Sequence, residues 1–289
     1  MSGLFLGLLS SLGYGTADFI ARFSSRKIGA TSVVFGVFLS GSVLLTGYIL
    51  WVGTGFNLTT DSFWLLPLAG IANMAMLVLI YCSLARGPIG IAAPIVASHP
   101  GLVLIILAIM GIVPSLLEVI GLLTIICGVV FLSLQAAHLA GGYDPKIDKS
   151  YVHKTVLIAA AGSVAYALQV VLCQEAALVF GPYQAAWGTR FFGMIAVCCL
   201  LLRQGVKPSI PLRWWLVIFA QGCLDVIGVL SLTLGSLDQD RVIVAILSST
   251  FAVVTVLLAR IFIKEPVSRL QWVAIFIIVV GIGIISAKG

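Results

Sequence analysis

Residues 138–154 read HLAGGYDPKIDKSYVHK, and this polar stretch divides the 289-residue chain close to its middle. Its Gly-Gly-Tyr-Asp-Pro run is typical of a loop. Apolar residues dominate the chain on both sides of it. We therefore predict a connecting loop at 138–154 between two apolar halves, residues 1–137 and residues 155–289.

The apolar content of the two halves excludes an ordinary soluble domain. The chain is 61% hydrophobic and 9% charged, with a mean hydropathy of +1.20. Soluble domains are about 45–50% apolar and about 25% charged. No globular core could hide so much apolar surface, because surface area grows too quickly with chain size. Lipid accepts this surface, so the sequence predicts an integral protein of the cell membrane.

Ten apolar runs of 20–25 residues are long enough to cross a bilayer as helices. Turn formers such as Gly29, Pro88 and Pro266 lie at their ends. The predicted fold class is thus all-α, a polytopic protein with ten transmembrane helices. The runs are 3–23, 31–53, 62–84, 90–111, 115–137, 155–178, 183–203, 212–235, 242–263 and 268–287.

The two halves resemble each other in sequence. A shift of 152 positions places Tyr14 on Tyr166, and it also superimposes several glycines in order. These glycine pairs are Gly29 with Gly181, Gly36 with Gly188, and Gly41 with Gly193. Matches at nearly one offset indicate an internal repeat of five spans. Because five is odd, the two copies must lie in opposite orientations, so we predict two inverted five-helix repeats.

The loop charges support this inversion. Of the 16 Lys and Arg residues, 13 lie in or beside the loops after spans 1, 3, 5, 7 and 9. The positive-inside rule makes this basic face cytoplasmic and predicts both termini outside. Inverted repeats are typical of secondary transporters. The 13 residues are Arg22, Arg26, Lys27, Arg86, Lys146, Lys149, Lys154, Arg203, Lys207, Arg213, Arg260, Lys264 and Arg269.

Two opposite charges lie deep within spans of the second half. Arg190 is near the middle of span 7, and Asp225 is near the middle of span 8. A charge at this depth costs about 2.5–3.5 kcal/mol on insertion scales, so such groups usually face the bundle interior. Two interpretations stay open. The pair either only locks two helices, or Arg190 binds an anionic substrate group while Asp225 binds and releases a proton.

A second polar centre lies at Ser98-His99-Pro100 in span 4. Pro100 removes a helix hydrogen bond and leaves the carbonyl of Val96 without its usual donor. Such backbone is tolerated in a membrane only against protein or a water-filled cavity. The imidazole of His99 titrates near neutral pH, which suits a proton relay. The alternative is a packing histidine satisfied by a carbonyl.

The repeat aligns His99 with Thr250, which follows Ser249 in span 9. We therefore expect Ser98, Ser249 and Thr250 to contact substrate, with His99 and Thr250 facing each other across a central pathway. Asp18 and Arg22 share one face of span 1. They form a local pair at the interface, or Asp18 gates the cytoplasmic mouth and takes part in proton or ion coupling.

Uncharged side chains complete the predicted substrate site. Trp187 lies three residues before Arg190, so one helix face offers an aromatic surface beside a cation. That combination suits an amphipathic solute with a carboxylate, such as an amino acid. The alternative for each polar residue is a tie between helices. The further candidates for substrate contact are Tyr14, Asn73, Tyr166, Gln169 and Gln174.

The layout resembles the drug/metabolite transporter superfamily, specifically its EamA-type ten-helix members, over essentially the whole chain. The best local match is Glu265-Pro266, followed by Ser268, Gln271 and the 281–283 region of the last span. The resemblance implies a transporter of metabolites without identifying the solute, and it implies that spans 4 and 9 line the cavity. Family members commonly have cytoplasmic termini, which the charge distribution of this chain does not favour.

The first half departs from that family pattern. Pro114-Ser115 stands where a glutamate is expected, and Glu118 holds the position of the glutamine.

We predict a secondary transporter of a small polar or amphipathic metabolite, with an amino-acid-like solute favoured. It would work by alternating access, coupled to a proton or ion gradient or by exchange. The alternatives are an intramembrane enzyme acting on a lipid-linked substrate and a non-transporting membrane scaffold. The sequence has no phosphate-binding Gly-x-x-x-x-Gly-Lys-Ser/Thr loop, no His-Glu-x-x-His motif and no Gly-x-Ser-x-Gly turn.

The six cysteines lie inside apolar runs without metal-ligand spacing. We expect no catalytic residues, cofactor, metal or nucleic-acid partner. The expected partners are a small-molecule substrate and the lipid bilayer, with the chain as a monomer or weak homodimer.

Overall fold

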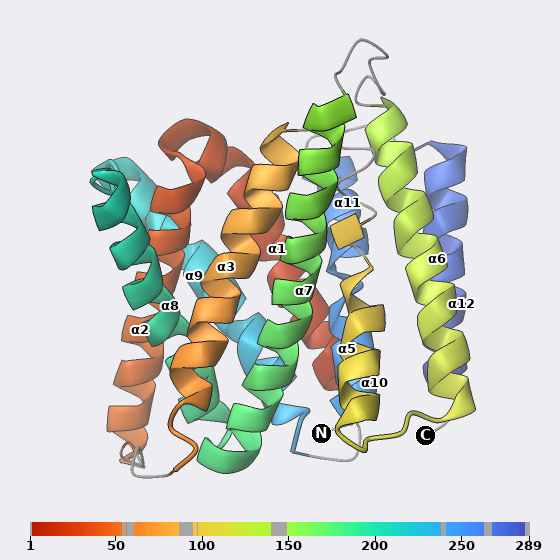
Figure 1. Ribbon diagram of the computed structural model, residues 1–289, viewed down its shortest axis with the longest axis horizontal. Helices are drawn as coiled ribbons and strands as arrows, with labels where there is room; N and C mark the ends of the chain where they lie inside the picture. Colours follow the sequence, from red (N-terminus) through yellow and green to blue (C-terminus); the bar gives the residue numbers. More distant parts are fainter. Residues whose placement is uncertain are drawn as a thin grey trace.

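The computed structural model describes residues 2–53, 56, 61–86, 95–96, 98–139, 149–237, 241–262 and 268–286. Within these ranges the regular elements are all α-helices (Figure 1). In the first half they are α1 (Gly3–Ile28), α2 (Ala30–Val52), α3 (Leu65–Arg86), α5 (His99–Ile109) and α6 (Leu116–Leu139). In the second half they are α7 (Lys149–Phe180), α8 (Pro182–Gln204), α9 (Leu212–Leu234), α10 (Arg241–Ser248), α11 (Phe251–Phe262) and α12 (Arg269–Ser286).

These helices form the ten predicted spans, since α10 and α11 lie in one apolar segment, Arg241–Phe262. By length and composition, six segments of the described chain are able to cross a membrane. Shorter apolar helices supply the other four: Leu65–Ile80, His99–Ile109, Leu116–Leu132 and Arg269–Ile285. The all-α, polytopic fold class is confirmed.

Helix ends occur where the sequence provides turn residues and caps. Gly29 separates α1 from α2 with φ of 85°, a conformation that favours glycine. Gly181, its equivalent in the second half, separates α7 from α8 with φ of 82°. The repeat therefore extends to the backbone conformation of these turns.

Equivalent capping boxes start α6 and α12. The Ser115 N–H donates to Glu118 Oε2 at 2.6 Å, and the Ser268 N–H donates to Gln271 Oε1 at 2.8 Å. In each case the serine hydroxyl accepts from the backbone N–H three residues on. Glu118 thus caps α6 as Gln271 caps α12, which explains how the first half tolerates its departure from the family pattern.

The crossing of α6 and α12 demonstrates the inversion. A Cβ atom on Gly121 would lie 3.0 Å from the carbonyl oxygen of Gly281, and one on Gly128 would lie 3.0 Å from that of Ala274. At an offset of 153, Gly121 is equivalent to Ala274 and Gly128 to Gly281. Each residue therefore contacts the equivalent of the other, in antiparallel order. In Figure 1, α6 rises where α12 descends.

The remaining helix contacts obey the same pseudo-twofold relation. α3 packs on α7, and α9 packs on α1. α5 lies against α7, while α10 and α11 lie against α1. α2 packs on its own equivalent, α8. Much of the packing thus joins one half to the other, so the two inverted repeats form one interlocked bundle.

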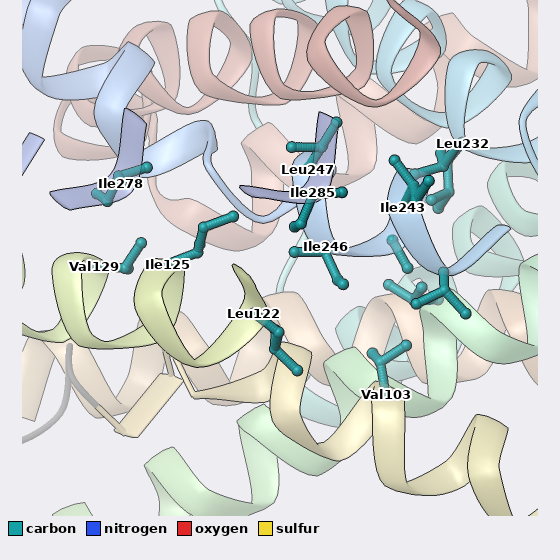
Figure 2. Packing of buried hydrophobic residues seen from close by; sticks show 14 of the residues in the cluster. Val103, Leu122, Ile125, Val129, Leu232, Ile243, Ile246, Leu247, Ile278 and Ile285 are labelled. Carbon is teal, nitrogen blue, oxygen red and sulfur yellow. The ribbon is translucent and has the colours of Figure 1, made fainter. Parts of the chain in front are cut away.

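The largest apolar cluster lies between α5, α6, α10 and α12. Figure 2 shows Leu122 and Ile125 of α6 near Ile246 of α10 and Ile285 of α12. Large apolar side chains also cover the outside, where Leu212 of α9 is 88% exposed. A bundle that is apolar inside and outside is suited to lipid.

Two predicted spans are interrupted rather than continuous. α5 begins at His99, and Ser98 before it forms a turn, while residues 90–94 and 97 of predicted span 4 lie outside the described residues. Span 9 is broken at Ser249 and Thr250, between α10 and α11. Because His99 aligns with Thr250, the two interruptions occupy equivalent places in the repeats.

Candidate functional site

At the break in span 4, side chains bond to the local backbone. His99 Nδ1 donates to the carbonyl oxygen of Val96 at 3.0 Å. This is the carbonyl that Pro100 deprives of a backbone donor. Ser98 Oγ likewise donates to the Ile95 carbonyl oxygen at 2.7 Å. Since a carbonyl only accepts, the proton of the neutral imidazole is on Nδ1, which leaves Nε2 as an acceptor.

The break in span 9 is stabilised in the same way. The hydroxyls of Ser248, Ser249 and Thr250 each donate to the carbonyl three residues before them, at 2.9, 2.6 and 2.8 Å. Thr250 Oγ1 also lies 3.0 Å from Ser11 Oγ of α1. The predicted contact residues Ser249 and Thr250 are therefore engaged by their own backbone and, for Thr250, by α1.

Aromatic rings occupy the space around the His99 imidazole. His99 is buried and stacks on the ring of Tyr166, with 3.8 Å between centroids and 3° between planes. Phe251, the residue after Thr250, lies 6.4 Å from the His99 centroid and 6.1 Å from that of Tyr166. Tyr166 thus joins the break in span 4 to α7, and Phe251 brings the break in span 9 to the same place.

Arg190 and Asp225 form an ion pair between α8 and α9. Arg190 Nε lies 2.5 Å from Asp225 Oδ2, with the two side chains 1% and 17% exposed. Arg190 Nη2 donates to the backbone carbonyl oxygen of Asp225 at 3.4 Å. Arg190 Nη1 is also buried and has no hydrogen-bond partner in the part of the chain that the structure describes.

Tyr14, Asp18 and Tyr166 lie in the electrostatic neighbourhood of this ion pair. The Tyr14 side chain hydrogen-bonds with Arg190, and its ring covers Gly228 of α9, where a Cβ atom would lie 2.7 Å from it. Asp18 interacts with Asp225, and Tyr166 interacts with Tyr14, Asp18 and both members of the pair. We refer to Tyr14, Asp18, Tyr166, Arg190 and Asp225 as the polar cluster.

Charge in the polar cluster departs from the symmetry of the fold. The offset that pairs Gly41 with Gly193 makes Phe38 the equivalent of Arg190 and Asn73 the equivalent of Asp225. In the first repeat, Phe38 belongs to an apolar cluster with Val34, and Asn73 is a buried amide. The first repeat therefore has a phenyl ring and an uncharged amide where the second places an ion pair.

Trp187 lies in a group of aromatic side chains next to the polar cluster. Its Nε1 donates to Thr46 Oγ1 of α2 at 2.9 Å, and its ring stacks on Phe191 at 4.8 Å. The Phe56 ring lies 4.7 Å from it. Trp187 belongs to an apolar cluster against which Tyr14 packs. Trp187 and Arg190 are thus linked through Tyr14 as well as along α8.

Some predicted residues are not joined to the polar cluster by any described contact. Asn73 on α3 and Gln169 on α7 are both buried. Gln174 Nε2 instead donates to the Arg241 carbonyl oxygen at 3.1 Å, and Arg241 Nη2 pairs with Glu175 Oε1 at 2.6 Å. These contacts tie α7 to α10. The side chain of Arg22, the predicted partner of Asp18, lies outside the described residues.

Sequence reasoning missed three contacts around the site. Ser11 bonds Thr250, Thr46 bonds Trp187, and Cys173 Sγ lies 3.3 Å from Thr189 Oγ1. The sequence could have identified Ser11, because it lies three residues before Tyr14 on the same helix face. Across the described ranges, no group of three His, Cys, Asp or Glu residues is placed to hold a metal ion.

Comparisons with known proteins agree with this architecture. A family model described as the EamA-like transporter family matches residues 1–134 and again residues 153–287. One solved crystal structure is similar over 99% of this chain and 96% of its own, with a TM-score of 0.80 and 19% sequence identity. At that identity the likeness concerns the fold alone. A search of curated proteins gave no match.

Proposed function

Because the chain belongs to the EamA-like transporter family, we propose that it is a secondary transporter of a small, carboxylate-bearing solute, with an amino-acid-like solute favoured. The family is one of membrane transporters, and the ten-span fold makes this chain an integral membrane protein. The proposal adds the solute class, the alternating-access mechanism and the residues that carry it. It assigns no chemical reaction to the chain.

The observation that carries the solute class is the unused donor of Arg190. Burying a charged N–H without a partner is costly, so an unpaired guanidinium nitrogen inside a bundle indicates a missing acceptor. A carboxylate matches the planar fork of a guanidinium and accepts two parallel hydrogen bonds from it. The solute carboxylate would therefore bind Arg190 beside Tyr14. The apolar cluster that contains Trp187 would contact the apolar part of the solute.

An amino acid would also balance the charges of the polar cluster. Its carboxylate would compete with Asp225 for Arg190. Its ammonium group would then bind Asp225, with Asp18 as the neighbouring carboxylate. The internal ion pair is thereby exchanged for two ion pairs to the solute, so neither Arg190 nor Asp225 is left without a partner.

Coupling would use the carboxylates of the same cluster. When both are ionised, Asp18 and Asp225 carry two negative charges against the single cation of Arg190. A proton or other cation that enters when the internal pair opens would neutralise the excess. His99, stacked on Tyr166, would relay a proton through its Nε2 acceptor.

The two interrupted spans provide the proposed hinges. Serine, threonine and histidine side chains replace backbone bonds at His99 and Thr250, so the helix halves on either side can tilt without exposing carbonyls. Their equivalent places in inverted repeats would open one side while closing the other. We further propose that the basic loops face the cytoplasm, that both termini lie outside, and that a monomer suffices.

Counterflow in proteoliposomes tests this function. Vesicles with the purified chain are loaded with unlabelled solute and exposed to labelled amino acids, their amides and the matching amines, with and without a pH gradient. The proposal expects saturable, trans-stimulated uptake of at least one amino acid and little uptake of its amide. Flux that rises linearly with concentration would indicate a channel. Equal uptake of the amino acid and its amide would contradict the proposed binding of the solute carboxylate by Arg190.

A further inference from the structure

An open surface recess of about 420 Å³, called the cavity below, lies at the basic edge of the bundle, away from the polar cluster. It is lined by Lys27 near the end of α1, and by Arg213, Trp214 and Val217 in the first turns of α9. It is the place where the end of one helix and the start of its neighbour leave a hollow between them.

The cavity carries positive charge without a matching acid. Lys27 and Arg213 are exposed, and neither makes an ion pair with any residue that the structure describes. Arg213 is the second residue of α9, and no side chain caps the N–H groups of that helix start. The positive end of the helix dipole therefore adds to the two cations, so the cavity favours an anion.

The symmetry of the fold indicates that this hollow is not a packing accident. α3 meets α7 in the first-repeat equivalent of the contact between α9 and α1. The counterparts of Trp214 and Val217 there are Ser62 and Leu65. Leu65 packs with Phe180 in one apolar cluster, so hydrocarbon occupies part of the equivalent place. Val179 and Asp61 take the places of Lys27 and Arg213, so the equivalent place lacks both cations.

The surroundings favour a lipid over a soluble anion. Leu212 and Leu216, on α9 beside the cavity, are 88% and 78% exposed and so present an apolar surface to the bilayer. Trp214 is half-buried at the same level, as expected of an aromatic residue at a membrane interface. A ligand with a phosphate and acyl chains would use the cations and this surface together.

We propose that Lys27, Arg213 and Trp214 form a binding site for the phosphate headgroup of an anionic phospholipid, with its acyl chains against Leu212 and Leu216. The site is separate from the proposed transport pathway and does not depend on the identity of the solute. Its chemistry is that of a basic recess at a helix end, open to lipid on one side.

Native mass spectrometry of the purified chain tests the site directly. The protein is mixed with phosphatidylglycerol or phosphatidylcholine of the same acyl chains, and retained lipid is counted. We expect preferential retention of phosphatidylglycerol, reduced about tenfold or more in the double variant Lys27→Gln, Arg213→Gln. The matched control, Arg203→Gln with Lys207→Gln, removes two exposed charges near the end of α8 that do not line the cavity and should retain the lipid.

A second variant separates shape from charge. Val217→Trp keeps both cations but fills the hollow, and it should also lose the preference. Equal losses in the control double variant would mean unspecific attraction to a basic face and would overturn the proposal. Retention of phosphatidylglycerol by Val217→Trp would also overturn it. So would competition by soluble glycerol phosphate as effective as that by the lipid, because the acyl chains would then contribute nothing.

Discussion

Arg190 of α8 lies over the ring of Phe38 of α2, its own equivalent in the other repeat, with 5.9 Å between the guanidinium carbon and the ring centroid. The pseudo-twofold axis therefore passes between a cation and a phenyl ring. The backbone obeys the symmetry, since Gly41 contacts Arg190 as Gly193 contacts Phe38. The ion pair at the centre of the bundle belongs to the second repeat only.

That asymmetry predicts the stability of variants that copy the first repeat into the second. Arg190→Phe leaves the Asp225 carboxylate buried without its cation and should lower the free energy of unfolding by about 3–5 kcal/mol. The double variant Arg190→Phe, Asp225→Asn should be more stable than Arg190→Phe, because it removes both charges. Thermal unfolding in detergent measures both. A double variant less stable than the single one would contradict the account of the pair.

The hydroxyl of Tyr14 should matter for binding more than that of its equivalent. Tyr14→Phe removes the group that hydrogen-bonds Arg190 and should weaken solute binding by about fivefold to tenfold. Tyr166→Phe keeps the ring that stacks on His99 and is the matched control, with a smaller effect. Concentration dependence of uptake gives the half-saturation constants. Equal effects of the two variants would argue against a special role for Tyr14.

The antiparallel crossing of α6 and α12 predicts which glycine of α12 is needed for packing. A Cβ atom at Gly281 would lie 2.7 Å from a side-chain carbon of Ile125, so Gly281→Leu should destabilise the bundle by about 1–3 kcal/mol. Gly283 has open space around it, and Gly283→Leu should be tolerated. The melting temperatures of the two variants test this prediction. Similar melting temperatures would contradict the close contact of Gly281 with α6.

The capping box of α6 predicts a graded response at Glu118. Glu118→Gln reproduces the box that Gln271 forms on α12 and should leave stability nearly unchanged. Glu118→Ala removes the acceptor of the Ser115 N–H and should cost about 1 kcal/mol. Chemical denaturation of both variants, compared with wild type, measures this. A large loss in Glu118→Gln would mean that the negative charge itself is required.

Much of the fold follows from one-dimensional features of the chain. Apolar runs locate the spans, and glycine turns such as Gly29 and Gly181 locate their ends, since lipid leaves few other solutions. The five-span repeat then requires the inversion. The interruption at Ser249 and Thr250 was not predictable from hydropathy, because the apolar run continues through it. The boundaries of the halves, 1–137 and 155–289, stay a prediction.

The candidate site was partly predictable for a physical reason. Arg190 and Asp225 were singled out because charges deep in a span are rare, and the structure pairs them. The contacts of Trp187 with Thr46 and of Thr250 with Ser11 depend on how two helices are rotated against each other. The pattern of apolar residues within one helix does not determine how that helix is rotated against its neighbour. Whether these residues bind substrate stays a prediction.

The central claim is that the Arg190 guanidinium binds the carboxylate of a transported solute. The most direct measurement is counterflow of the labelled solute into proteoliposomes with Arg190→Ala, beside Arg203→Ala, which removes an exposed arginine of the same helix. The account predicts that Arg190→Ala lowers uptake by about tenfold to a hundredfold, as expected for a lost charged hydrogen bond, while Arg203→Ala transports normally. Undiminished uptake by a folded Arg190→Ala protein would contradict it.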